Sequence, residues 1–116
     1  MSYAHDRGYK AEHAIETFLQ GRGHMCWRPR AGALADRGDI AGIPIVISVK
    51  DHTTLALGSW VGDLPRMVLA SGLETGVVWH KRRGSGDPRM WYVTTTGAFF
   101  LPFYDAYVAA AKQACP

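Results

Sequence analysis

Residues 38–52, GDIAGIPIVISVKDH, place charged side chains at both ends of an apolar run. Asp39 opens the run and Lys50 closes it, and Asp51 and His52 follow at once. Charged side chains are seldom held beside a hydrophobic core unless they are paired or bind something. An acid and a lysine at the two ends of one apolar run therefore mark a candidate site.

An acid and a lysine that converge are suited to hydrolysis of a phosphodiester bond. That reaction needs neutralisation of the charge that builds on the phosphate, activation of a water molecule and stabilisation of the leaving oxygen. Carboxylates that hold Mg²⁺, with a lysine beside them, supply all three. Magnesium is usually held by one or two protein carboxylates together with substrate phosphate oxygens. A second acid near Asp39 and Lys50 would therefore complete such a site.

The second acid is expected from a helix over residues 9–20. Apolar side chains recur there at helical spacing and form one stripe, made of Ala11, Ala14, Ile15, Phe18 and Leu19. At about 100° per residue, Glu12 falls at the edge of this stripe and Glu16 lies further towards solvent. Glu12 is thus the helix acid better placed to reach the surface of a sheet.

A hairpin is expected to return Asp39 to the neighbourhood of Lys50. Residues 38–41 predict a short strand, a turn follows, and residues 45–50 predict a β-branched strand that is apolar on both faces. Such a strand is typical of the interior of a sheet. Alternation along it puts Ser48 and Lys50 on the same face.

The remaining pattern predicts a single domain over residues 1–116. Three further strands are expected at 24–30, 76–82 and 90–95. Two further helices are expected, one within 59–71 that is either kinked at Pro65 or begins near Asp63, and a C-terminal one interrupted at Pro102. The fold class is therefore α/β, with a central mixed sheet of about five strands flanked by helices.

These motifs resemble the PD-(D/E)XK nuclease superfamily, in particular its Holliday-junction-resolvase-like members, which include small resolvases encoded by phages. In that family a helix glutamate, an aspartate that opens a hairpin and an acid-x-lysine triplet on the next strand form the site. The stretches that carry the resemblance are RGYKAEHAIETFL and GDIAGIPIVISVK, and more loosely VVWHKRRGSGDPRMWYVTT. The resemblance implies a restriction-endonuclease-like nuclease core.

The resemblance also implies a role for each residue of the site. Glu12 would bind a metal ion directly or through water, and Asp39 would be its central ligand. The backbone carbonyl of Val49 would be a further oxygen ligand. Lys50 would position or deprotonate the attacking water and offset phosphate charge. The implied cofactor is Mg²⁺, with Mn²⁺ as a substitute.

One position departs from the family pattern. The acid of the triplet should stand at residue 48, where this sequence has Ser48. A neutral hydroxyl is a poor replacement for a carboxylate on a hard cation. Three explanations stay open: a site with fewer acids and weaker metal affinity, compensation by a nearby acid such as Asp51, or a catalytically weakened form, natural or engineered.

The distribution of basic residues suits an anionic partner. The formal net charge is +3 and the sequence pI is about 9.1, which is compatible with nucleic acid without requiring it. Cations lie near the start, around the segment before Asp39, and in the loop HKRRGSGDPR at 80–89. The residues expected to contact DNA are Arg7, Lys10, Arg28, Arg30, Arg37, His52, Lys81, Arg82 and Arg83.

Partners and compartment follow from the same features. The C-terminal helix is dense in aromatic residues, which predicts core packing or a homodimer contact. Symmetric cutting of a four-way junction takes two active sites, so a two-fold dimer is expected. No apolar run is long enough for a bilayer and no signal peptide is evident, so the expected location is the cytoplasm, that of the host cell if the chain is phage-encoded. Cys26 and Cys115 are expected as free thiols.

The resemblance thus implies a metal-dependent endonuclease that resolves four-way junctions by phosphodiester hydrolysis. The same site would serve an exonuclease or a nuclease specific for flaps or single strands. A DNA-binding module with weakened catalysis is a further alternative, for which Ser48 is the discriminating feature. An interaction protein without either activity is the last, and the basic loops argue weakly against it.

Overall fold

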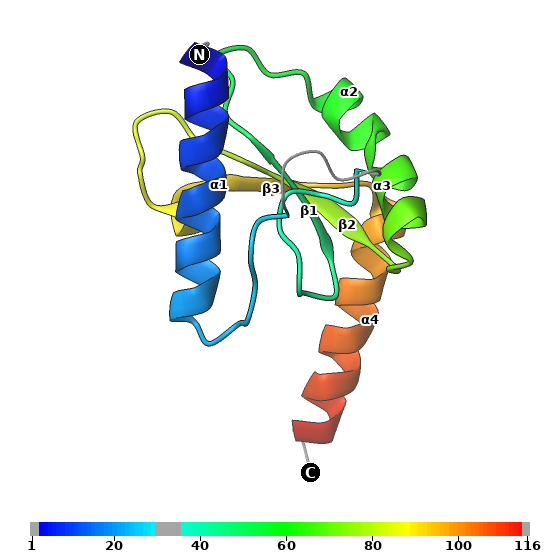
Figure 1. Cartoon of the computed structure of the whole chain (residues 1–116). Helices are drawn as coiled ribbons and strands as arrows, with labels where there is room; N and C mark the ends of the chain where they lie inside the picture. The colour runs from blue at the N-terminus through cyan, green and yellow to red at the C-terminus, as the bar shows by residue number, and fades with distance from the viewer. Residues whose placement is uncertain (1–2, 30–35, 115–116) are drawn as a thin grey trace.

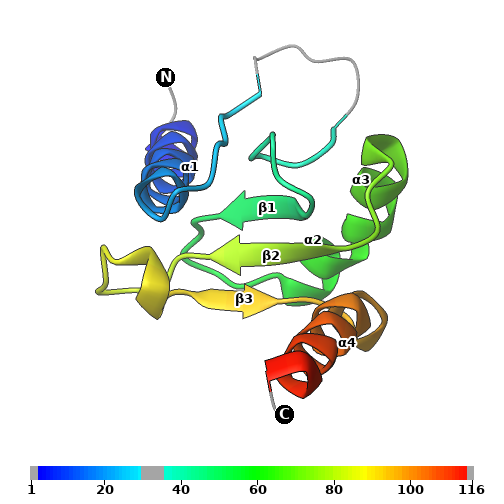
Figure 2. The same ribbon diagram turned by 90° about the horizontal axis from the view of Figure 1, so that it is seen from below.

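A mixed three-stranded sheet forms the centre of the protein, with helices on both of its faces (Figure 1). The structure is a computed structural model that describes residues 3–29 and 36–114. The strands are β1 (Val46–Lys50), β2 (Gly76–His80) and β3 (Tyr92–Thr94), in that order across the sheet. β1 and β2 run parallel, and β3 is antiparallel to β2 (Figure 2).

Two groups of helices cover the two faces. α1 (Tyr3–Gly21) buries Ala11 and Ile15 against Ile47 and Val49, on one face of β1. α2 (Leu57–Gly62) and α3 (Leu64–Ser71) pack on the other face, where they share a core with Val46 and Val78. The remaining helices are the short 3₁₀ turn η1 (Pro88–Met90) and α4 (Gly97–Ala114).

The connection between β1 and β2 explains the two central helices. Parallel strands cannot be joined by a tight turn, so the chain crosses over through α2 and α3. Asp63 separates these helices, and Pro65 stands in the first turn of α3. Of the two readings of Pro65, the one in which a helix begins near Asp63 is therefore confirmed. Gly72 ends α3 in the left-handed region, at φ 73°.

The segment before β1 differs from the prediction. Instead of strands at 24–30 and 38–41, the described residues there form a single antiparallel bridge between Trp27 and Ala41. Gly42 adopts a φ of 87°, and a Cβ at this position would lie 2.5 Å from the Trp27 ring. This turn follows the bridge directly, and the pairing spans one residue on each side. The sheet therefore has three strands within the described residues, against about five expected.

The C-terminal helix also differs from the prediction, because α4 continues through Pro102 without interruption. Proline in the second turn removes one backbone hydrogen bond but does not end the helix. α4 extends away from the body of the molecule (Figure 1). With α4 included, the molecule measures 55 × 30 × 27 Å along its principal axes. Within the part of the chain that the structure describes, no helix is long and apolar enough to cross a membrane.

Candidate functional site

Asp39 lies along the outer edge of β1. Its backbone N–H donates to the Ile47 carbonyl at 2.7 Å, and the Val49 N–H donates to its Oδ2 at 2.6 Å. β1 is thus an edge strand of the described sheet, which corrects the expectation of an interior strand. The edge is nevertheless not left open, because the segment that carries Asp39 pairs with it. The expected proximity of Asp39 to the end of the 45–50 strand is confirmed.

Burial raises the pKa of the Asp39 carboxyl above its usual value, because the low-dielectric surroundings disfavour the charged form. The hydrogen bond from Val49 and the charge of Lys50 act in the opposite direction, and the charge of Asp36 adds to the rise. Asp39 is therefore a carboxylate that lacks a full counter-charge. A cation placed beside it would stabilise the ionised form.

The Val49 carbonyl points to the same edge as the Asp39 carboxylate. In an extended strand the N–H and C=O of one residue point to the same side, and the Val49 N–H points to Asp39. The next carbonyl along the strand points inwards, since Lys50 accepts a hydrogen bond from the Lys81 N–H at 2.9 Å. A carboxylate and a carbonyl at one edge are hard oxygen donors of the kind that Mg²⁺ binds, with water and phosphate filling the other positions.

Ser48 and Lys50 lie on the same face of β1, as alternation predicts, and this is the face covered by α2 and α3. Ser48 is 1% exposed and sits opposite Val78 in the sheet. The position that carries an acid in the resembling family is therefore a core position in this chain. A longer charged side chain there would enter the apolar cluster rather than reach the edge.

Glu12 approaches from the opposite face, because α1 packs against Ile47 and Val49. It is half-buried, in agreement with its predicted place at the border of the apolar stripe. The pKa of Arg28 is raised chiefly by its hydrogen bond with Tyr9, and the charges of Glu16 and Glu12 add to the rise. Lys50 and Glu12 thus come from opposite faces of the sheet. The charge of Lys50 acts on the Asp39 carboxyl.

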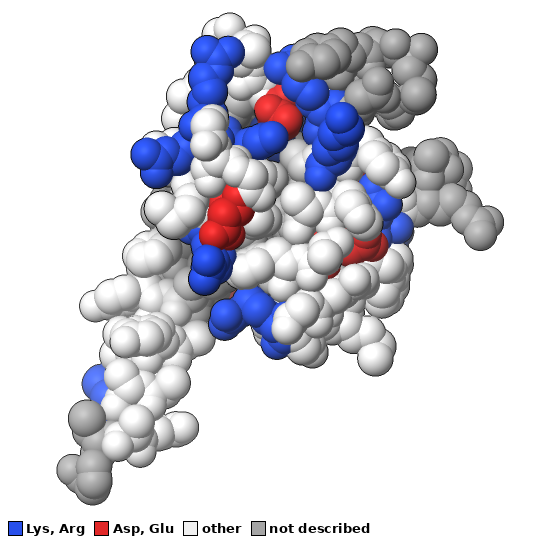
Figure 3. Space-filling view, turned by 90° about the vertical axis from the view of Figure 1, so that its left-hand side faces the viewer, with Lys and Arg blue, Asp and Glu red and all other residues white. Residues whose placement is uncertain are grey.

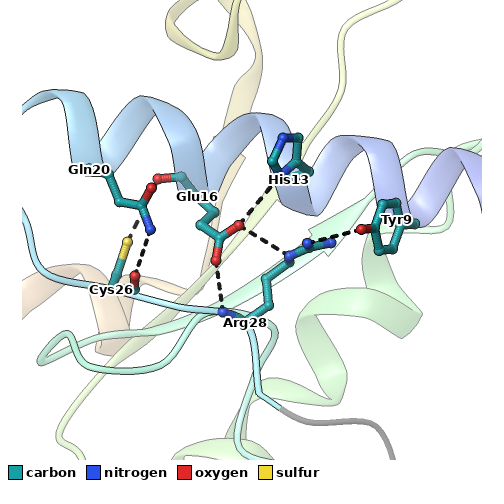
Figure 4. A network of polar contacts seen from close by, with 6 residues as sticks. All are labelled: Tyr9, His13, Glu16, Gln20, Cys26 and Arg28. Carbon is teal, nitrogen blue, oxygen red and sulfur yellow. Dashed lines mark hydrogen bonds and ion pairs between the residues drawn. The ribbon is translucent and has the colours of Figure 1, made fainter.

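The prediction that Glu16 lies towards solvent is wrong. Its side chain is 14% exposed; its Oε1 lies 3.2 Å from Arg28 Nε, and its Oε2 accepts the Arg28 backbone N–H at 3.1 Å. Arg28 also donates to the Tyr9 hydroxyl at 3.3 Å and lies over the Tyr9 ring (Figure 4). Gln20 adds a hydrogen bond to the Cys26 carbonyl at 2.9 Å. This network fastens residues 26–28 to α1, so Arg28 has a structural task whatever else it contacts.

The candidate metal ligands do not form a larger cluster within the described residues. Among residues 3–29 and 36–114, no three His, Cys, Asp or Glu side chains are arranged to hold a metal ion. The site proposed from sequence contains only two carboxylates, Glu12 and Asp39, together with a carbonyl. The free thiol predicted at Cys26 is confirmed, and it is buried.

A basic hollow of about 610 Å³ opens at the carboxyl ends of β1 and β2. Its lining comes from α1, from the loop that follows Lys50, and from the loop that follows His80. Parallel strands end at the same edge of a sheet, which is where α/β proteins commonly bind ligands. Figure 3 shows Lys and Arg side chains gathered on the upper part of this side of the molecule. The lining residues are Arg7, Lys10, Asp51, His52, Thr53, Leu55, Lys81, Arg82, Arg83, Gly84 and Tyr92.

Six of the nine residues predicted to contact DNA line this basic hollow: Arg7, Lys10, His52, Lys81, Arg82 and Arg83. Of the other three, Arg28 is held by Glu16, Arg37 is exposed outside the hollow, and Arg30 lies outside the described residues. The structure therefore brings together cations that are far apart in sequence.

Tyr92 is one of the residues of the hollow that sequence reasoning missed, with Thr53 and Leu55. It is 52% exposed at the start of β3, and its ring lies 5.9 Å from the Arg82 guanidinium carbon. Alternation in MWYVTT could have placed Tyr92 on the face opposite Trp91 and Val93, but nothing in that pattern shows which loop it would meet. An exposed aromatic ring among cations is a surface on which an unpaired base can stack.

Comparisons with protein-family models, with curated proteins and with solved structures find no match to this chain.

Proposed function

We propose that this chain is a metal-dependent DNA endonuclease of PD-(D/E)XK type that acts on branched DNA such as the four-way junction. The observation that carries the proposal is the convergence of six predicted DNA contacts on one hollow, which begins at Asp51, directly after Lys50. The hollow thus begins, along the chain, where the strand that carries the Val49 carbonyl ends, although Glu12, Asp39 and Lys50 do not line it.

Each residue of the edge would have a separate task. Asp39 and the Val49 carbonyl would hold Mg²⁺ or Mn²⁺, with Glu12 contributing directly or through water. The bound ion would neutralise charge on the phosphate and activate a water molecule. Lys50 would orient that water and offset the charge that develops on the phosphate oxygens. The raised pKa of Asp39 suits this arrangement, since a carboxylate short of counter-charge gains most from a cation.

The basic hollow would hold the DNA backbone. Side chains from three separate segments can contact successive phosphates, and such contacts position the nucleic acid without reading its sequence. Exposed Tyr92 would stack on a base that a junction or flap leaves unpaired. Symmetric cutting of both strands of a junction would take two copies of the chain, and the reaction would take place in the cytoplasm.

Ser48 favours a second candidate, a DNA-binding module without catalysis. The acid of the family triplet is replaced by a residue that is 1% exposed in the core. Loss of that acid leaves the hollow intact, so phosphate binding would persist while metal affinity falls.

Cleavage assays separate these candidates. Wild type and Asp39→Asn are compared on labelled four-way junctions and on linear duplex, each with Mg²⁺, with Mn²⁺ and with EDTA. Junction cleavage that needs the ion and is lost in Asp39→Asn supports the nuclease. Binding that is retained without cleavage in any condition supports the module. If neither protein binds DNA, both proposals are wrong.

A further inference from the structure

α4 contributes no buried side chain to the core of the protein. None of its 18 residues is buried. It is attached near its start, where the Thr75 hydroxyl donates to the Phe99 carbonyl and Phe103 packs on the α1 side of the sheet. Beyond this attachment it is exposed, and Tyr107 is 75% exposed. Helices gain most of their stability from tertiary packing of an apolar face, and within the described residues α4 packs on the core only near its start.

One side of α4 carries a continuous apolar surface. At about 100° per residue, seven residues fall within an arc of about 120° that contains no charged side chain. Asp105 and Lys112, the charged residues of this helix, lie outside it. Figure 3 shows the arm formed by α4 almost free of charge. We call this arc the α4 stripe; its members are Phe100, Phe103, Tyr104, Tyr107, Ala110, Ala111 and Ala114.

The α4 stripe continues into an apolar hollow of about 640 Å³ on the α1 side of the sheet. Phe100 and Phe103 belong to both surfaces. Most of the remaining lining is apolar and includes Ile43, Ile45, Ile47, Val77, Trp79 and Val93, with His24 and Thr95 as its polar members. The apolar surface therefore extends from the tip of α4 onto the sheet, and its size and continuity are typical of an interaction surface.

The side chains of the α4 stripe are arranged so that the stripe fits a copy of itself. The first half is large and aromatic, and the second half consists of alanines. An antiparallel two-fold pairing centred on Tyr107 sets Phe100 opposite Ala114, Phe103 opposite Ala111 and Tyr104 opposite Ala110. Large residues then meet small ones on both sides of the centre, where Tyr107 meets its own copy, and close packing of two helices favours such large-to-small pairs. A parallel pairing would set large against large.

The area of the α4 stripe and the apolar hollow is also adequate for a specific interface. A helix of this length is roughly 27 Å long, and the half of its surface around the α4 stripe, with the adjoining hollow, is on the order of the ~800 Å² per partner that a specific interface buries. We propose that the α4 stripe and the apolar hollow bind a second copy of this chain, with the two α4 helices antiparallel about Tyr107. The pairing does not rest on the proposed nuclease function, because no residue of the α4 stripe belongs to the basic hollow or to the edge of β1.

Sedimentation velocity over the micromolar range tests the pairing. Wild type is expected as a dimer, and Tyr104→Glu/Tyr107→Glu as a folded monomer with unchanged far-ultraviolet circular dichroism. Leu69→Glu is the matched control, since Leu69 is 85% exposed on α3, outside the α4 stripe; it is expected to remain a dimer. A monomeric wild type would overturn the pairing. If that monomer instead co-floats with phosphatidylcholine vesicles, the α4 stripe contacts lipid and not a second copy.

Cross-linking tests the register. In a Cys115→Ser background, Tyr107→Cys places a thiol at the two-fold axis, and mild oxidation is expected to convert it to a disulfide-linked dimer. Ala114→Cys, whose two thiols would lie about 21 Å apart in the antiparallel pairing but side by side in a parallel one, is expected to stay monomeric on a denaturing gel. Equal cross-linking of the two variants would contradict the antiparallel arrangement.

Discussion

The carboxylate of Asp39 accepts a hydrogen bond from the backbone N–H of Val49 at 2.6 Å. The Asp39 backbone N–H in turn donates to the Ile47 carbonyl, so one residue satisfies two polar groups on the outer edge of β1. The same residue is thus both part of the fold and the proposed centre of the active site. The effect of a substitution at Asp39 must therefore be measured on the stability of the fold and on the activity together.

Asparagine and alanine at residue 39 are expected to separate these two roles. Burial raises the pKa of Asp39 above 3.8, so the folded state binds its proton more tightly than the unfolded state. The stability that this contributes is present below that value and is lost as pH rises through the folded pKa. Asp39→Asn keeps an acceptor for Val49 without the buried charge, so it should be more stable than wild type at neutral pH, and this gain should shrink in acid.

Asp39→Ala should instead be less stable by about 1–3 kcal/mol, because it leaves the buried Val49 N–H without an acceptor. Urea unfolding of both variants at neutral and acidic pH measures the difference. Equal stability of the two variants would show that the hydrogen bond from Val49 contributes little. Both variants should be inactive on DNA.

Substitution of Ser48 should report on the core and not on catalysis. Ser48→Glu would place a carboxylate at a site that is 1% exposed beside Val46 and Val78, and burial of an unpaired charge costs several kcal/mol. The variant is expected to lose much of its thermal stability and to gain no cleavage activity. Ser48→Ala, the matched control, should fold normally. A stable and more active Ser48→Glu would show that residue 48 reaches the edge of the sheet.

Neutral substitutions in the basic hollow should lower the dependence of DNA binding on salt. Each phosphate contact contributes about 0.7–0.9 to the slope of log K against log salt concentration. Arg82→Ala and Arg83→Ala should each reduce the slope by about that amount and weaken binding to all DNA sequences alike. Arg66→Ala is the control, because Arg66 lies on α3, 3.6 Å from Asp36 and outside the hollow. Fluorescence anisotropy at several salt concentrations measures the slopes, and an equal loss in Arg66→Ala would argue against the hollow.

His80 should make the fold sensitive to mild acid. It is 4% exposed, its Nε2 lies 2.7 Å from the Thr94 hydroxyl, and burial lowers its pKa below 6.5. The unfolded state therefore binds the proton more tightly, and stability is lost as pH falls below 6.5 through the folded pKa. In His80→Phe this acid-induced loss should be smaller, while the rings of Trp60 and Tyr92 still have an aromatic neighbour. Melting temperatures from neutral to mildly acidic pH compare the two proteins, and parallel curves would exclude His80 as the cause.

Local patterns in the sequence determined most of the elements of this fold. The spacing of Ala11 and Ile15 indicates a helix, and the β-branched runs before Lys50 and His80 indicate strands. Each signal depends on residues within a few positions of one another. The same locality made Ser48 and Lys50 share a face, and it put a run of cations in the loop after His80.

The tertiary structure alone decided how these elements meet. Glu16 looked exposed on an isolated helix, but Arg28 from a later segment covers it. Alternation showed that the strand with Ser48 is apolar on both faces, but not that it ends the sheet or that Asp39 pairs with its edge. Contacts between residues far apart along the chain depend on the crossover through α2 and α3, and no local spacing encodes that path. For the same reason, only the fold could bring Arg7, His52 and Arg82 into one hollow.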